Sequence, residues 1–383
     1  MVLQRASWSA PVAEKPARPS TALPVARPWL PPADQLLPYL RSIDEARWYS
    51  NFGPLAVSLE NRFAARLAPP AGVVSTANGT LALTLALKAA ANGREGLCAI
   101  PAWTFAATPH AALAAGLTPW FVDVDPETWM LEAEGLSRVL AGAPGPVVAA
   151  VPVAAYGRLP DLDAWKTLRD ETGLTVVLDA AAAFDSLTDA AIPAAVSLHA
   201  TKVLGVGEGG FVAAEDAELL RRVRELSSFG FRGSREAQMP AGNAKLSEYA
   251  AAVGHAGLDG WPAARMRYML AAQRLRIALI DHPRVRFQPG WGSEWISSTC
   301  VVGLPDGAAA RTAARLKAEG VDTRQWWGDG CHLTPAFAGL PRADLGNTER
   351  LAASTLGLPF AIDLEPREIG RIAGALIGAL GGL

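Results

Sequence analysis

The first part of the chain alternates short apolar runs with segments that favour helices. The runs lack the alternation of polar and apolar residues that marks a half-exposed strand, and they lie at residues 73–76, 97–100, 119–124, 147–153, 175–178 and 210–213. Strands that are nearly continuously apolar and separated by helices indicate a parallel sheet covered on both faces. We therefore predict an α/β fold with a mostly parallel sheet sandwiched by helices.

The pattern changes after about residue 284. Strand, strand, helix, strand and helix candidates follow one another at 284–288, 298–302, 308–319, 322–327 and 366–380. A long helix predicted at 263–280 would connect this part to the sheet. A chain of 383 residues has room for two domains. We predict a large domain over 31–262, beginning with a helical segment, and a smaller α+β domain over 263–383.

Composition excludes several classes of protein. Residues 1–30 are rich in Ala, Pro and Ser without the apolar stretch of a secretory signal, which predicts a disordered extension. A net charge of −2 argues against nucleic acid or an anionic membrane as the main partner. The cysteines Cys98, Cys300 and Cys331 are scattered, so neither a disulfide framework nor a metal site is expected. These features favour a soluble cytoplasmic protein that acts on small molecules.

Lys202 has an unusual position. It lies between a short apolar strand and a turn that contains four glycines, and an upstream strand ends at Asp179. A lysine held on a rigid turn near a carboxylate is the arrangement that pyridoxal phosphate (PLP) requires, with a Schiff base to the lysine and an acid on the ring nitrogen. A surface lysine and a helix-capping aspartate remain alternatives, and Asp185 is a weaker candidate for the acid. The glycines also match a dinucleotide-binding pattern, but they lead into an apolar strand, not a helix.

Other residues could complete such a site. Gly79 and Thr80 lie at a strand-to-helix junction, where free amides and the helix dipole attract anions, although simple capping would look the same. Ser197 adds a hydroxyl near Lys202, and the segment around Phe105 supplies aromatic rings for a flat coenzyme. Arg324 and His332 lie in the predicted small domain, where a substrate could be enclosed; an ordinary polar surface is the simpler interpretation.

In this order, the motifs resemble those of the DegT-type sugar aminotransferases, a branch of the fold-type I PLP enzymes related to aspartate aminotransferase. The resemblance rests on Gly53-Pro54 with Glu60, the segments 77–83, 101–108, 121–125 and 151–157 (which contains Tyr156), Asp179-Ala-Ala, Ser197 to Gly210, and Asn243 to Ala252.

The resemblance implies a role for each matching residue. Lys202 would form the Schiff base and Asp179 would contact the ring nitrogen. Gly79, Thr80 and Ser197 would bind the phosphate, and Phe105 would stack on the ring. Asn243 would come from the partner subunit, which implies a homodimer with shared active sites. Tyr156, which lies in a matching segment, joins Arg324 and His332, which are candidates because of their place in the predicted small domain, as a residue for contacting the substrate.

The implied reaction transfers an amino group, from glutamate by family resemblance, to a keto group of a nucleotide-linked sugar, as in amino-sugar or polysaccharide biosynthesis. Three positions depart from the family pattern: Ala154 for a frequent histidine, Ala182 for the usual glutamine, and Lys245 for arginine. The first two normally face coenzyme or substrate, so a keto-cyclitol or another non-nucleotide acceptor is an alternative. A non-catalytic PLP-binding regulator is a second alternative. Dehydratase relatives have histidine at the position of Lys202, which favours transamination here.

Overall fold

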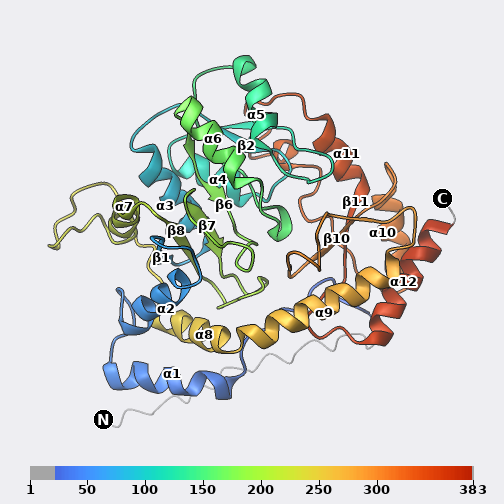
Figure 1. Cartoon of the computed structure of the whole chain (residues 1–383), viewed down its shortest axis with the longest axis horizontal. Helices are drawn as coiled ribbons and strands as arrows, with labels where there is room; N and C mark the ends of the chain where they lie inside the picture. The colour runs from blue at the N-terminus through green and yellow to red at the C-terminus, as the bar shows by residue number, and fades with distance from the viewer. Residues whose placement is uncertain (1–21, 382–383) are drawn as a thin grey trace, which may run out of the picture.

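The computed structural model of the chain describes residues 22–381 and contains one continuous sheet (Figure 1). Two ladders, β3-β2-β4-β5 and β1-β8-β7-β6, join because Val177 N–H donates to Ala150 O (3.1 Å) and Val153 pairs with Asp179. Among the described strands of this large sheet, the antiparallel pairs are those that β8 makes with β1 and β7. The strands are β1 (Gly72–Thr76), β2 (Leu97–Pro101), β3 (Thr118–Val122), β4 (Val147–Ala150), β5 (Thr175–Val176), β6 (Leu178–Asp179), β7 (Ala194–Ser197) and β8 (Gly210–Ala214).

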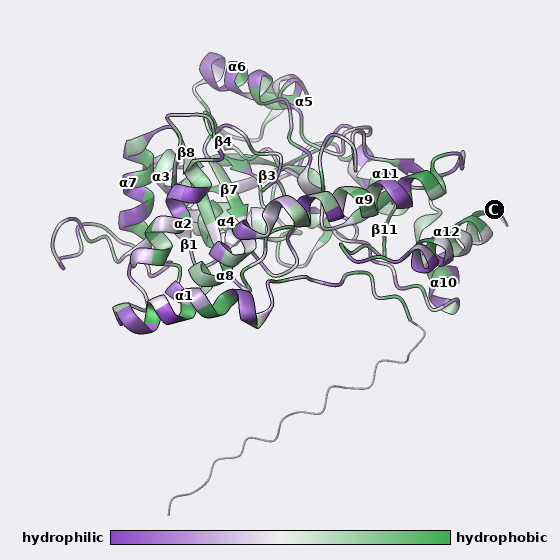
Figure 2. Ribbon diagram, turned by 60° about the horizontal axis from the view of Figure 1, so that its bottom comes forward, coloured by the Kyte–Doolittle hydropathy of each residue, from purple (hydrophilic) through white to green (hydrophobic). Residues whose placement is uncertain are grey.

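Helices cover this sheet, as the apolar runs predicted. They are α1 (Ala33–Ala46), α2 (Pro54–Ala64), α3 (Gly79–Ala91), α4 (Ala107–Ala114), α5 (Ala133–Val139), α6 (Leu162–Thr172), α7 (Ala217–Ser227) and α8 (Glu248–Asp259). First-turn amides of α3, α6, α7 and α8 donate hydrogen bonds to the capping side chains of Asn78, Asp161, Asp216 and Ser247, respectively. Figure 2 shows apolar colour in the central strands and polar colour on the outer faces of α1, α6 and α7. The predicted α/β architecture is confirmed.

The C-terminal part has a small sheet of its own. The long helix α9 (Trp261–Leu279) leads to it, and its antiparallel strands lie in the order β11-β10-β9. Its elements are β9 (Arg286–Phe287), β10 (Cys300–Gly303), α10 (Ala309–Ala318), α11 (Gly346–Ser354), β11 (Thr355–Leu358) and α12 (Pro366–Gly381). The strand predicted at 322–327 is wrong: only Arg324 pairs there, with Gly357. The domain boundary at residue 263 stays a prediction.

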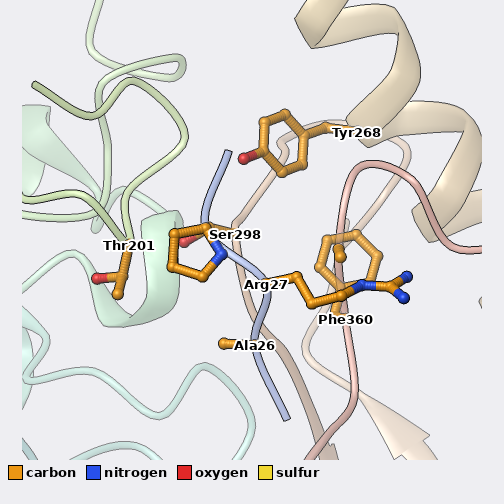
Figure 3. A pocket seen from close by; sticks show the side chains of 8 residues that line it. Ala26, Arg27, Thr201, Tyr268, Ser298 and Phe360 are labelled. Carbon is orange, nitrogen blue, oxygen red and sulfur yellow. The ribbon is translucent and has the colours of Figure 1, made fainter. Parts of the chain in front are cut away.

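Residues 22–30 correct the expectation of a disordered extension up to residue 30. Leu23 pairs with Val321 and Ala26 with Phe360, and Arg27 binds both carboxylate oxygens of Glu368 at 2.8 and 3.0 Å. Figure 3 shows the small cavity beside this segment, with Thr201 on one side and Tyr268 and Phe360 on the other. The segment therefore lies between the Lys202 loop and the C-terminal part. The remainder of the predicted extension, residues 1–21, lies outside the described residues.

Between residues 22 and 381, no helix combines the length and the apolar character that crossing a bilayer requires.

Candidate active site

The carboxyl ends of several strands meet at one edge of the large sheet, which is where open α/β sheets bind ligands. Thr76 and Ser197, at the ends of β1 and β7, both pair with Gly210 on β8. Asp179 ends β6, and the segment containing Phe105 follows β2. Residues far apart in the sequence thus lie at a common edge of the sheet, because the strands that carry or precede them end there.

Gly79 forms a tight corner with Ser197. A Cβ atom on Gly79 would lie 2.6 Å from Ser197 Cβ, and one on Gly210 would lie 2.7 Å from the carbonyl carbon of Asn78, so neither position has space for a side chain. Asn78 caps α3 by accepting from Leu81 N–H (2.9 Å), and the first intrahelical bond runs from Ala82 N–H to Asn78 O (3.0 Å). The amides of Gly79 and Thr80 precede that bond and can bind an anion.

Asp179 is buried, with 6% of its surface exposed. Its Oδ2 accepts from the Thr108 hydroxyl at 2.8 Å, and its Oδ1 accepts from Ala181 N–H at 3.1 Å. Burial raises the pKa of Asp179, while the two hydrogen bonds and the nearby Lys202 charge oppose that rise. No helix follows Asp179, so the capping alternative is wrong.

Lys202 lies on a compact loop that returns to the sheet. Ala200 N–H donates to Gly207 O (2.8 Å), Val206 N–H donates to Leu198 O (2.8 Å), and Gly207 has a φ of 93°. Gly210 opens β8, which rules out a dinucleotide-binding turn because that turn must open a helix. Burial lowers the pKa of Lys202, and the attraction of the Asp179 carboxylate opposes this decrease. A larger fraction of the Lys202 amine is therefore uncharged at a given pH than for an ordinary lysine.

This lowered pKa predicts how Lys202 reacts with an aldehyde. Only the neutral amine attacks, so the rate of PLP capture by the apo chain should rise with pH and level off below pH 10.5, the ordinary lysine value. Stopped-flow absorbance across the pH range measures this rate, with N-acetyl-lysine amide as the reference amine. A rate of PLP capture that rises with pH in parallel with the reference amine up to pH 10.5 would contradict a lowered pKa for Lys202.

Phe105 and Asn243 are exposed at the surface of the single chain. Phe105 is 62% exposed, whereas its neighbour Trp103 is buried and packs edge-on against Trp327. Phe105 is therefore the ring of this segment that is free to cover a ligand. Asn243 accepts a hydrogen bond from Lys245 Nζ at 2.6 Å and makes no described contact with Lys202 or Asp179.

The three substrate candidates have different surroundings. Tyr156 is buried and stacks on Trp327, with ring centroids 4.2 Å apart, and its hydroxyl has no partner among the described residues. Arg324 is exposed and lies over the Trp326 ring at 5.1 Å. His332 is 1% exposed near Phe121, and burial lowers its pKa. The structure therefore contradicts a polar-surface interpretation of His332 and brings none of the three against Lys202.

Sequence reasoning missed Thr104, Thr108 and Trp327. Thr108 holds Asp179, Thr104 contacts Thr108, and Trp327 reaches from the C-terminal part to Trp103 and Tyr156. The sequence offered a signal for the two threonines, because Thr104 and Thr108 are hydroxyl residues four positions apart that follow a buried strand closely. No signal in the sequence connects Trp327 to residues so far away in the chain.

These residues fit PLP. The Gly79 and Thr80 amides and the Ser197 hydroxyl form a corner suited to a phosphate, the buried Asp179 suits a protonated ring nitrogen, and Lys202 offers a reactive amine. No group of three or more metal-ligating side chains occurs among residues 22–381. The donor set thus matches an anionic, nitrogen-containing aldehyde.

Known proteins are similar to this chain in sequence and in fold. The sequence model described as "DegT/DnrJ/EryC1/StrS aminotransferase family" matches residues 33–377. The chain is 30% identical over 377 residues to Protein Rv3402c of Mycobacterium tuberculosis, covering 92% of this chain and 89% of that one. It is 31% identical over 351 residues to dTDP-3-amino-3,4,6-trideoxy-alpha-D-glucose transaminase of Streptomyces venezuelae, with coverage of 88% and 89%. The crystal structure of DesI with its TDP-sugar product superimposes with a TM-score of 0.84 at 34% identity, covering 94% of each chain.

Proposed function

The chain belongs to the DegT/DnrJ/EryC1/StrS aminotransferase family and is a PLP-dependent aminotransferase, and we propose that its acceptor is a keto group on a nucleotide-linked sugar. The meeting of Lys202, Asp179 and the Gly79–Ser197 corner at one edge of the sheet supports PLP chemistry at this edge. The similarity to a dTDP-aminosugar transaminase and to a protein solved with its TDP-sugar product supports this acceptor class.

Different residues of the chain would bind the coenzyme and transfer the proton. When bound, PLP supplies the electron sink that makes amino transfer possible. The Gly79 and Thr80 amides and the Ser197 hydroxyl would hold its phosphate, and Asp179 would keep a proton on its ring nitrogen. Lys202 Nζ, whose pKa burial lowers, would accept a proton from the substrate carbon and return it two atoms away, which is the 1,3-proton shift that transamination requires.

The acceptor class is tested directly with a panel of substrates. The purified chain with PLP and glutamate is offered nucleotide-linked keto sugars, the same sugars without nucleotide, and keto-cyclitols, and products are identified by mass spectrometry. We expect an amino sugar still linked to its nucleotide. Amination of only the unlinked compounds would contradict the proposal.

The keto-cyclitol alternative keeps a specific observation in its favour. Ala154, 3% exposed, and Ala182 present only methyl groups where the family has side chains that contact coenzyme or substrate. Amination of keto-cyclitols in the same panel, without amination of nucleotide sugars, would favour this alternative.

We also propose that two copies of the chain share their active sites. The chain between α7 and α8 extends from the body as a long loop (Figure 1). Asn243 is exposed on this loop. Lys245 Nζ donates to Asn243 and lies 4.6 Å from the ring centroid of Phe229, which is 45% exposed. Tyr249, six residues beyond Asn243, is 50% exposed. Exposed rings beside an exposed amide suit a protein interface, and they would bring Asn243 to the partner's phosphate corner.

Hybrid dimers separate a shared site from a self-contained one. Lys202→Ala subunits, expected to be inactive alone, and Asn243→Ala subunits, expected to be weakly active alone, are unfolded together and refolded. If Asn243 acts across the interface, each hybrid dimer has one intact site, and random pairing should restore about a quarter of wild-type activity. Activity that stays at the level of the separate variants would contradict sharing.

A further inference from the structure

Behind Asp179 lies a chain of two buried hydroxyl groups. Thr108 Oγ1 donates to Asp179 Oδ2 at 2.8 Å, and Thr104 Oγ1 lies 2.8 Å from Thr108 Oγ1. Thr104 is 1% exposed and Thr108 is fully buried. Because water does not reach these hydroxyls, their hydrogen bonds have few alternative partners, and their direction is set by the protein.

The direction of the chain follows from counting protons. The Thr108 hydroxyl has one hydrogen, and it is donated to the Asp179 carboxylate. Thr108 Oγ1 can therefore only accept from Thr104, so the Thr104 hydroxyl donates to it. Two successive donors then point toward Asp179, and each polarises the next, which strengthens the final bond to the carboxylate.

A competing hydrogen bond from the Thr108 hydroxyl to its own helix backbone is less available. A threonine in a helix commonly donates to the carbonyl four residues earlier, which here is Thr104 O. That carbonyl accepts from Cys331 Sγ at 2.9 Å, and Cys331 N–H also holds Ala102 O at 2.9 Å. Cys331 comes from the C-terminal part of the chain, so a distant segment holds the backbone of Ala102 and Thr104, from which the first of the two hydroxyls extends.

We propose that Thr104 is a positioning residue for the reaction: through Thr108 it orients and stabilises the Asp179 carboxylate that faces the coenzyme ring. The inference rests on the proposed role of Asp179. Thr104 itself is separated from Asp179 by Thr108, so it acts only through that hydroxyl.

The test is a double-mutant cycle with three readouts: the Kd of PLP for the apo chain, the visible spectrum of the bound coenzyme, and the rate of the half-reaction with saturating amino donor. Thr104→Val should raise the Kd of PLP and lower the rate, each by about three- to fivefold, without changing the donor concentration for half-saturation. It should also shift the spectrum. Thr104→Ser should restore wild-type values because it keeps the hydroxyl.

The Asp179→Asn background decides between positioning and a general structural effect. There, adding Thr104→Val should change none of the three readouts, because the carboxylate that the chain supports is gone. Thr312→Val, at another fully buried threonine on α10, is the matched control and should leave all three unchanged. Should Thr104→Val not fold, Thr104→Ala removes the same hydroxyl without adding volume.

Two results would overturn the inference: a Thr104 variant indistinguishable from Thr312→Val, or an effect of equal size in the Asp179→Asn background. A wild-type chain that takes up no PLP would instead contradict the proposed function. The two failures are therefore distinguishable.

Discussion

The Lys202→Ala variant should fold normally and have essentially no aminotransferase activity. Lys202 is half-buried, and its amine lies near the buried Asp179 carboxylate. In the proposed mechanism it both attaches the coenzyme and moves the proton. Proton transfer by a positioned group alone contributes about 10²- to 10⁴-fold to a rate, so we expect a loss of at least about 10³-fold. The visible absorbance that hydroxylamine removes from the wild-type chain should also be absent.

The matched control is Lys317→Ala, which removes an exposed lysine on α10. It should retain wild-type activity and absorbance. Circular dichroism and the thermal melting curve check that both variants are folded. A folded Lys202→Ala variant that keeps even a tenth of wild-type turnover would show that another group performs the proton transfer.

The Asp179→Asn variant should bind PLP and react slowly. Asparagine keeps the size of the side chain but removes the charge that would hold a proton on the ring nitrogen. A hydrogen bond to a charged group contributes about 1.5–3 kcal/mol, which corresponds to a rate loss of about 10- to 150-fold. Single-turnover kinetics with saturating amino donor measures the loss at the chemical step, separately from binding.

A second substitution distinguishes a specific role of the Asp179 carboxylate from the general effect of losing a buried carboxylate. Asp185→Asn removes the buried carboxylate that Arg265 binds at 2.8 Å, six residues further along the chain. It should lower stability and leave the single-turnover rate close to wild type. Equal rate losses in the two variants would indicate that any buried carboxylate in this segment supports the fold, and that Asp179 has no special role at the ring nitrogen.

The sheet was predictable because its strands are buried on both faces. Strands such as β2 and β8 are buried at every residue, which requires an unbroken apolar run and leaves a clear signal. The tight corner of Gly79, Ser197 and Gly210 has a local signal, because one glycine begins a helix and another begins a strand. Asp179 ends a strand and Lys202 precedes a glycine turn, and their roles at the coenzyme stay predictions.

Contacts between distant segments were beyond sequence reasoning. The Thr104–Thr108–Asp179 chain depends on the pairing of β2 with β4 and on the β4–β6 contact, which no local pattern specifies. His332 has a polar side chain but lies buried between the C-terminal part and Phe121. The segment 322–327 has strand propensity but finds a partner only at Arg324. Residues 22–30 are held by pairing with Val321 and Phe360, about three hundred residues away.

The central claim is that Lys202 carries the coenzyme, and borohydride trapping tests it most directly. The wild-type chain is incubated with PLP, reduced with borohydride, digested and analysed by tandem mass spectrometry to locate the modified lysine. We expect one stoichiometric modification, on the peptide that contains Lys202, and its loss when glutamate is added before reduction. Stoichiometric modification of a different lysine, or none at all, would contradict the account.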